Sequence, residues 1–89
     1  MSPQLTKHFT VRFSQRVARS KRMLEFANRA LRYGREVSSI KNGELRRALA
    51  EKENEYSTMA KVYHNSVYWF SGDRAVTVYP LPQKYHGRF

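Results

Sequence analysis

Three side chains near the start of the chain have the chemistry to act on a phosphate ester. His8, Arg12 and Arg16 recur at every fourth residue of the segment KHFTVRFSQR, so on a helix they form a ladder with steps of about 6 Å. An imidazole exchanges protons near neutral pH, and a guanidinium holds a phosphate through paired hydrogen bonds. RNA cleavage without metal needs both functions, because a base takes the 2′-hydroxyl proton, an acid protonates the 5′ oxygen and cations stabilise the pentacoordinate phosphorus. The alternative is that His8 is an ordinary residue near a helix N-terminus and transfers no proton.

The positive charge of the chain is concentrated in its first third. The net charge is +10 over 89 residues; residues 1–35 hold nine basic residues and one acidic residue, a net +8, against +2 for residues 36–89. This imbalance predicts a polyanionic partner, RNA above all, either free or on the ribosome. The alternative is a solvated helical surface. The residues expected to bind nucleic acid beside the ladder are Lys7, Arg19, Lys21, Arg22, Arg29, Arg32 and Arg35.

The composition excludes several other classes of protein. The length suits a single domain over residues 1–89. Cysteine is absent and the three histidines lie far apart without acidic neighbours, so we expect no metal and no other cofactor. The start of the chain lacks the apolar run of a signal peptide, and no stretch approaches the ~18 apolar residues of a membrane span. We therefore expect a cytoplasmic protein with no membrane partner.

The elements that must position the ladder are helices in residues 1–35. An apolar stripe at a spacing of four predicts a helix over residues 5–18, with Thr6 as its N-cap. A second amphipathic helix is expected between Ser20, which can open it, and Gly34, which can close it. The sequence leaves open whether these are two helices or one helix bent around Arg19.

Residues 59–82 predict an antiparallel meander, because they are rich in β-branched and aromatic residues. The turn sequences HNS and SGD divide this segment into three strands, over residues 59–63, 67–70 and 75–79. Strict alternation in the last strand places Thr77 on one face with Ala75 and Tyr79. Residues 83–89 contain little core material and are expected to form a loose tail.

The aromatic residues of the second strand face two ways. Alternation puts Tyr68 and Phe70 on one side of the sheet and Val67 and Trp69 on the other. Exposed aromatic rings on a sheet can stack on bases. In a protein of this size, however, most such rings are expected to form the core.

Residues 36–58 are compatible with two structures. The segment GELRRALAEKENEY contains helix formers, with Leu45 and Leu49 at helical spacing. The dipeptide Asn42-Gly43 is also a hairpin signal, and we favour an edge strand from Glu44 to Leu49 followed by a charged loop. An open edge in so small a sheet is compatible with a monomer or a weak homodimer.

Three parts of the chain together resemble a known group of folds. The segment TKHFTVRFSQRV, the helix ending at Gly34 and the segment VYWFSGDRAVTVYPLP resemble small RelE-like domains of the barnase, EndoU, colicin and RelE group of ribonuclease folds. More narrowly, the pattern resembles an uncharacterised family of small domains in that group, with His-x-x-x-Arg-x-x-x-Arg at its start and a Thr in its last strand. Those positions are His8, Arg12, Arg16 and Thr77 here.

The resemblance implies a fold, a site and partners. The implied fold is α+β, with two N-terminal helices packed on one face of a three- to four-stranded antiparallel sheet and a cleft between the first helix and the sheet. The implied catalytic set is His8 for proton transfer, Arg12 and Arg16 as phosphate ligands, and Thr77 as a hydroxyl contact. Members of the wider group are toxins, so RNA and a neutralising antitoxin protein are the implied partners.

The sequence thus predicts a toxin-like hydrolase, a metal-independent ribonuclease that cleaves RNA by attack of the 2′-hydroxyl. The alternative is a non-catalytic basic protein that binds nucleic acid or the ribosome, such as an accessory protein of a phage or mobile element. A third class, a protein-interaction module, would require an exposed Tyr and Trp surface.

Overall fold

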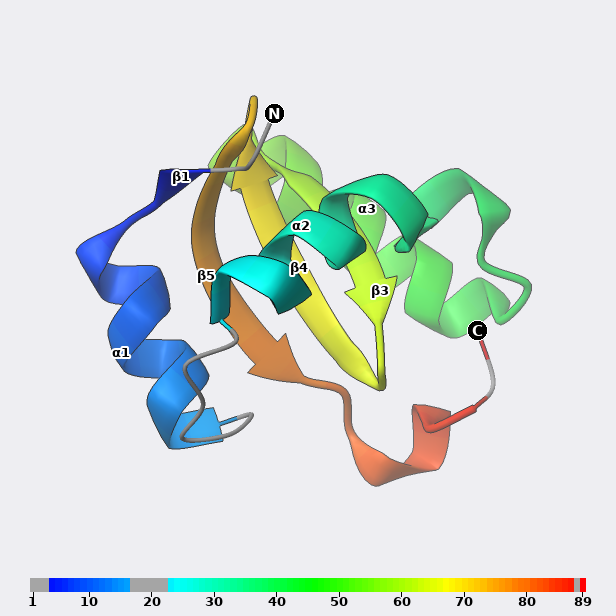
Figure 1. The fold of residues 1–89 in the computed structure, drawn as a ribbon. Helices are drawn as coiled ribbons and strands as arrows, with labels where there is room; N and C mark the ends of the chain where they lie inside the picture. The colour runs from blue at the N-terminus through cyan, green and yellow to red at the C-terminus, as the bar shows by residue number, and fades with distance from the viewer. Residues whose placement is uncertain (1–3, 17–22, 88) are drawn as a thin grey trace.

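Three helices and a five-stranded sheet make up the computed structural model, which describes residues 4–16, 23–87 and 89 (Figure 1). The helices are α1 (Lys7–Arg16), α2 (Met23–Tyr33) and α3 (Gly43–Tyr56), and the strands are β1 (Gln4–Leu5), β2 (Arg35–Glu36), β3 (Met59–Tyr63), β4 (Ser66–Ser71) and β5 (Arg74–Pro80). Two short 3-10 helices are η1 (Val37–Ser39) and η2 (Gln83–Tyr85). No helix of the described residues is long and apolar enough to cross a membrane.

The sheet is mixed, whereas the sequence predicted an antiparallel sheet of three or four strands. Its order is β1-β5-β4-β3-β2, and β1 runs parallel to β5 while every other pair is antiparallel. The predicted α+β class is confirmed. Both additional strands are only two residues long, and a strand that short has no alternation for a sequence to reveal.

The N-terminal helices are two separate elements that run in different directions (Figure 1). The predicted cap is confirmed, because the Thr6 hydroxyl accepts a hydrogen bond of 3.0 Å from the backbone N–H of Phe9. The expected opening residue Ser20 lies outside the described residues. Gly34 directly follows α2, as predicted. A Cβ at this position would collide with the Ala30 carbonyl oxygen and lie 2.9 Å from the Cβ of Lys61. The end of α2 can therefore pack this closely against β3 only because residue 34 is glycine.

Residues 43–56 form a helix, and the edge strand predicted from Glu44 to Leu49 is wrong. The side chain of Asn42 accepts a hydrogen bond of 3.1 Å from the N–H of Leu45, so Asn42 caps α3 instead of turning a hairpin. Leu45 and Leu49, four residues apart, are both buried. A strand would have put Arg47 on the same face as both leucines, whereas the helix leaves Arg47 exposed and buries only the leucines.

The predicted meander is confirmed as β3, β4 and β5. Its first turn has two consecutive residues with left-handed backbone, His64 at φ 49° and Asn65 at φ 59°, the conformation that closes a two-residue hairpin. The second turn contains Gly72 at φ 62°. Each of these conformations belongs to the residue types that tolerate it best, which is why the turn positions could be read from the sequence.

A β-bulge in β5 changes which side chains share a face. Trp69 is opposite Thr77 and Phe70 is opposite Ala75, so Val76 is an extra residue without a partner on β4. Ala75 is buried in the core on the α1 and α2 side, whereas Thr77 lines the other face. The prediction that Thr77 shares a face with Ala75 and Tyr79 is therefore correct for Tyr79 and wrong for Ala75.

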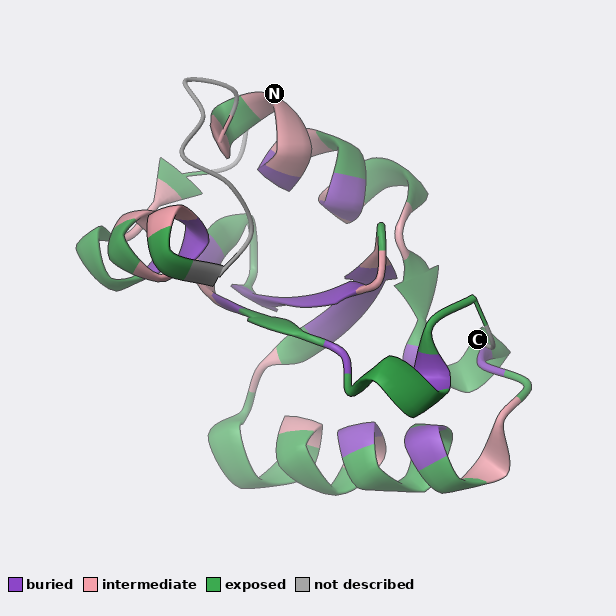
Figure 2. Cartoon of the chain, turned by 90° about the horizontal axis from the view of Figure 1, so that it is seen from below, coloured by how far each residue is buried: buried purple, intermediate pink, exposed green. Residues whose placement is uncertain are grey.

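The two faces of the sheet carry two hydrophobic clusters (Figure 2). The cluster between the sheet and the helices α1 and α2 consists of Phe9, Phe13, Ala27, Ala30, Tyr68, Phe70, Ala75 and Val78. On the α3 side lie Val37, Ile40, Leu45, Leu49, Ala60, Val62, Val67, Trp69, Leu81 and Tyr85. The predicted division of β4, with Tyr68 and Phe70 opposite Val67 and Trp69, is confirmed.

The C-terminal segment is tied to the body of the protein, in contrast to the loose tail predicted for residues 83–89. Tyr85 is buried in the α3-side cluster, and Phe89 packs against that cluster. The N–H of Gly87 donates to the side-chain oxygen of Asn65 at 2.9 Å, and the imidazole of His86 lies 2.8 Å from the Leu81 carbonyl oxygen. Two aromatic rings and these bonds offset the entropy of ordering the segment.

Candidate functional site

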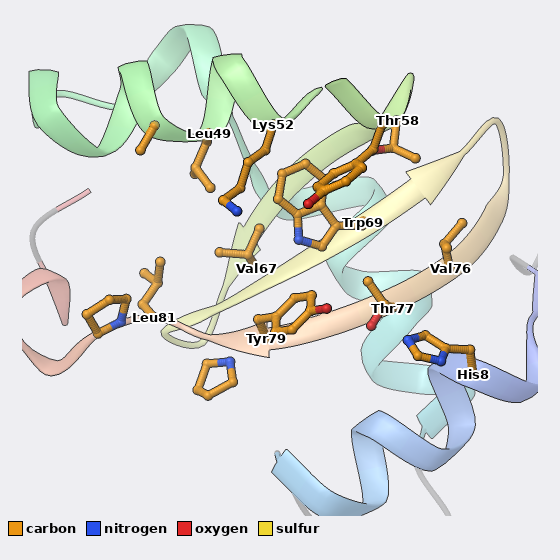
Figure 3. A pocket seen from close by; sticks show the side chains of 14 residues that line it. His8, Leu49, Lys52, Thr58, Val67, Trp69, Val76, Thr77, Tyr79 and Leu81 are labelled. Carbon is orange, nitrogen blue, oxygen red and sulfur yellow. The ribbon is translucent and has the colours of Figure 1, made fainter. Parts of the chain in front are cut away.

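A groove of about 540 Å³ lies on the α3 side of the sheet (Figure 3). Its floor comes from β4 and β5, one wall from α3, and His8 of α1 lies on the opposite side. Leu49 and Leu81 lie at one end and Thr58 and Val76 at the other. The volume falls within the range of roughly 300–1,000 Å³ typical of small-ligand pockets.

Aromatic rings dominate the surface of the groove. Trp69 lies in the floor and is only 5 % exposed, whereas Tyr79 of β5 is 43 % exposed and Tyr56 at the end of α3 is 56 % exposed. The rings of Tyr56 and Trp69 meet edge to face, with centroids 6.3 Å apart and planes at 89°. The Lys52 ammonium lies 5.8 Å from the centroid of the Tyr56 ring. The groove thus combines apolar rings with a cation.

The positions of His8 and Thr77 follow from how Thr6 joins α1 to the bulge. The Thr6 hydroxyl donates to the Val76 carbonyl oxygen at 2.9 Å, and the Thr6 N–H donates to the Ala75 carbonyl oxygen at 3.1 Å. The same hydroxyl caps α1 through Phe9. His8 is the second residue of that helix and Thr77 follows the bulge, so their side chains lie beside one another in the groove (Figure 3).

The Thr77 hydroxyl oxygen is enclosed and has no hydrogen-bond partner among the described residues. A buried hydroxyl without a partner costs free energy. The imidazole of His8 is exposed beside it. In this arrangement the Thr77 hydroxyl oxygen is not open to a ligand in the groove.

The two arginines of the predicted ladder are placed less completely than His8. Arg12 is half-buried one turn further along α1, does not line the groove, and donates to the Gln15 side-chain oxygen at 3.4 Å. Its Nε atom is enclosed and unpartnered among the described residues. Arg16 is the last residue of α1. The structure brings together His8 and Thr77 of the predicted set of four.

The other predicted basic residues are spread over the surface. Lys7 is exposed at the first position of α1. Arg29 and Arg32 are exposed on α2, on the opposite side of the sheet from the groove, and Arg29 pairs with Glu25 at 2.7 Å. Arg35 is exposed in β2. The remaining three, Arg19, Lys21 and Arg22, lie outside the described residues.

The groove has a positive character. None of the described residues that line it is acidic, whereas Lys52 and His8 both reach it. In residues 4–16, 23–87 and 89, no three His, Asp or Glu side chains converge as metal ligands would. The groove therefore suits an anionic ligand with flat apolar parts.

A clasp at one end of the groove joins α3 to η2. The Lys84 ammonium donates to the Glu44 carboxylate at 3.2 Å. Hydrogen bonds from Tyr85 and Lys84 lower the pKa of Glu44 below its ordinary value. Since Glu44 lies in the first turn of α3 and Lys84 follows the Pro80–Pro82 segment, the clasp links the two chain segments that border this end.

The sequence did not identify the α3 wall of the groove. Lys52 and Tyr56 fell in the segment predicted as an edge strand and charged loop, so neither was a candidate. The available signal was the spacing of four from Leu45 to Leu49, which continues on the same side of a helix towards Lys52 and Tyr56.

No protein-family model matches this chain, and neither a curated protein nor a solved structure matches it. The resemblance to RelE-like domains therefore remains an interpretation of the residues themselves.

Proposed function

We propose that the protein is a metal-independent ribonuclease whose site is the groove between α1 and α3. The observation that carries this proposal is that His8 of α1 and Thr77 of β5 line one groove, together with aromatic rings and a cation but no acidic residue among the described ones. An imidazole beside a bound RNA strand can supply the proton transfer that transesterification without a metal needs, and the arginines are the proposed source of charge stabilisation.

In the proposed reaction, the neutral imidazole of His8 accepts the proton of a ribose 2′-hydroxyl. The 2′ oxygen attacks the adjacent phosphorus, the bond from phosphorus to the 5′ oxygen breaks, and a 2′,3′-cyclic phosphate forms. The departing 5′ oxygen takes up one proton from water, and the imidazolium of His8 releases its proton to water, so the protons balance and the enzyme returns to its starting state. Arg12, Arg16 and the Thr77 hydroxyl are the proposed contacts to the phosphate oxygens.

The proposal includes the RelE-like resemblance and its biological setting. A two-helix N-terminal unit, an antiparallel meander and a groove beside the first helix support it. α3 departs from the implied arrangement, because it covers the second face of the sheet. The proposed setting is a toxin of the cytoplasm that acts on free or ribosome-bound RNA and is neutralised by an antitoxin protein.

One observation favours a second candidate, a basic protein that binds RNA or the ribosome without cutting it. No described residue hydrogen-bonds the imidazole of His8, and the neighbouring Thr77 hydroxyl is enclosed. Catalytic bases are ordinarily oriented by a second group. Under this candidate the groove binds the strand and His8 moves no proton.

Incubation of the purified protein with end-labelled RNA in excess EDTA separates the two candidates. We expect fragments with 2′,3′-cyclic phosphate ends from the wild type, and none from His8→Ala, which should retain its affinity for RNA. His64→Asn is the matched control, because His64 is exposed in the β3–β4 turn with a backbone conformation that Asn tolerates. Equal cleavage by His8→Ala would remove His8 from the reaction, and RNA that is bound but uncut by the wild type would support the second candidate.

A further inference from the structure

We propose that the part of the groove bordered by Tyr56 and Trp69 holds one unpaired nucleobase of the RNA strand, stacked on the Tyr56 ring. This inference rests on the proposed function for the identity of its ligand, but it concerns a different part of the groove from His8. It assigns a role in substrate selection to α3, which the RelE-like resemblance does not supply.

The arrangement of rings favours a flat ligand. Tyr56 stands perpendicular to Trp69, with an interplanar angle of 89°, so the two flat side chains that line this part of the groove face different directions. More than half of the Tyr56 surface is exposed, and Trp69 is fixed in the floor beneath it. Tyr79 shares the floor as a diagonal neighbour of Trp69, because β4 pairs Val67 with Tyr79 and Trp69 with Thr77.

Charge complementarity identifies the ligand as an anion that carries such a base. The Lys52 ammonium lies over the Tyr56 ring at 5.8 Å, so a base that stacks on that ring would displace the ammonium towards the adjacent phosphate. No described residue that lines the groove would repel that phosphate, and the chain as a whole carries a net charge of +10. A neutral apolar peptide would gain nothing from this cation.

The strand must be single at this position. A base within a duplex presents only its edges, whereas stacking on a side chain requires that its face be free. The site beside Tyr56 is part of the same groove as His8. A base bound there would therefore belong to a nucleotide near the phosphate that His8 reaches, and it would set which bond is cut.

Trp69 provides a direct readout, because it is the only tryptophan in the chain. We would titrate the protein with a short 2′-O-methylated oligoribonucleotide, which cannot be cut, and follow tryptophan fluorescence. An abasic strand of the same length is the matched ligand. Tyr33→Ala is the matched variant, because Tyr33 is 74 % exposed at the end of α2, which packs on the other side of the sheet.

We expect the base-containing strand to quench Trp69 and the abasic strand to leave it unchanged. Tyr56→Ala should weaken binding of the base-containing strand by about tenfold, since stacking on an aromatic side chain is worth that much. It should not affect the abasic strand, and Tyr33→Ala should bind both strands as the wild type does.

The outcomes separate this inference from the proposed function. Equal affinity for both strands with unchanged fluorescence would overturn the base site, even if RNA were still cleaved in the EDTA assay. Quenching by a nucleoside monophosphate but not by the strand would overturn it in favour of a free nucleotide. Base-dependent quenching in a protein that cleaves nothing would uphold the base site while contradicting the ribonuclease.

Discussion

The two faces of the sheet differ in how completely helices cover them. On one face, α1 and α2 bury Phe9, Phe13 and Phe70 completely. On the other, α3 packs on the sheet through its own Leu45 and Leu49 but leaves Thr77 and Tyr79 of β5 facing a groove. One helix is about 10 Å wide, so a single helix cannot cover strands that lie side by side at about 4.8 Å over the whole face.

The difference suggests a division of labour within one small sheet. On the covered face, Phe9, Phe13 and Phe70 are completely removed from water, so truncation of these rings should be costly to folding. The open face keeps large aromatic side chains in contact with solvent, which is costly unless a partner covers them. The predictions that follow test this division, from the largest effect to the smallest.

Phe13→Ala should lower the free energy of unfolding by about 3–5 kcal/mol, because it removes a completely buried ring from the covered face. Tyr79→Ala, a change of similar size on the open face, should cost about 1 kcal/mol or less, since 43 % of that side chain is already exposed. Urea unfolding followed by circular dichroism measures both values. Equal losses would contradict the division between the faces.

Thr6→Val should lower the free energy of unfolding by about 1–2 kcal/mol. A methyl group then replaces the hydroxyl that caps α1 and hydrogen-bonds the bulge at Val76. Thr6→Ser keeps the hydroxyl and should stay within about 0.5 kcal/mol of the wild type. Because this contact places His8 beside Thr77, Thr6→Val should also reduce RNA cleavage at temperatures where it remains folded. A fully stable and active Thr6→Val would show that the bulge contact does not position α1.

Tyr68→Phe should leave stability unchanged or raise it by about 1 kcal/mol. The Tyr68 hydroxyl is enclosed on the covered face without a hydrogen-bond partner among the described residues, and burial raises the pKa of its phenol. Tyr33→Phe, at an exposed position, is the neutral comparison. Thermal unfolding of the two variants measures the change in stability. A clear loss of stability in Tyr68→Phe would show that the Tyr68 hydroxyl makes a hydrogen bond.

Glu44→Gln should have the smallest effect and a distinctive pH dependence. Hydrogen bonds from Tyr85 and Lys84 lower the pKa of Glu44 in the folded protein, so their contribution is present above the unfolded-state pKa and is lost as the pH falls through the folded-state value. The variant should be slightly less stable than the wild type near neutral pH and equal to it in acid. If the urea midpoints of Glu44→Gln and the wild type still differed in acid, the Glu44–Lys84 clasp would not be the cause of the difference.

Local signals predicted much of the fold. The strands and turns of residues 59–80 were recognisable because left-handed turn positions carry His-Asn and Gly, and the cap at Thr6 and the end of α2 at Gly34 were visible for similar reasons. α3 was missed because Asn42-Gly43 is both a turn signal and a helix start, and Leu45 and Leu49 would share a face on a strand as well as on a helix. The parallel pairing of β1 with β5 joins residues 70 positions apart, which no local pattern encodes.

The site was predicted in part. His8 and Thr77 came from the spacing at the start of the chain and from a resemblance, and the structure places both in one groove. The face that Thr77 occupies depends on the bulge at Val76, whose position is set by the pairing of β4 with β5 and by Thr6. The basic residues expected to bind nucleic acid were predicted from charge alone. The fold places two of them, Arg29 and Arg32, on α2 and away from the groove.

Backbone NMR of the labelled protein with the uncleavable oligoribonucleotide tests the central claim most directly, because it shows which face of the sheet the strand touches. We expect the resonances of His8, Lys52, Thr77 and the Trp69 indole to shift on titration, while those of Arg29 and Arg32 stay in place. Shifts confined to α2, with the groove unchanged, would contradict the account and make the basic surface of that helix the binding site.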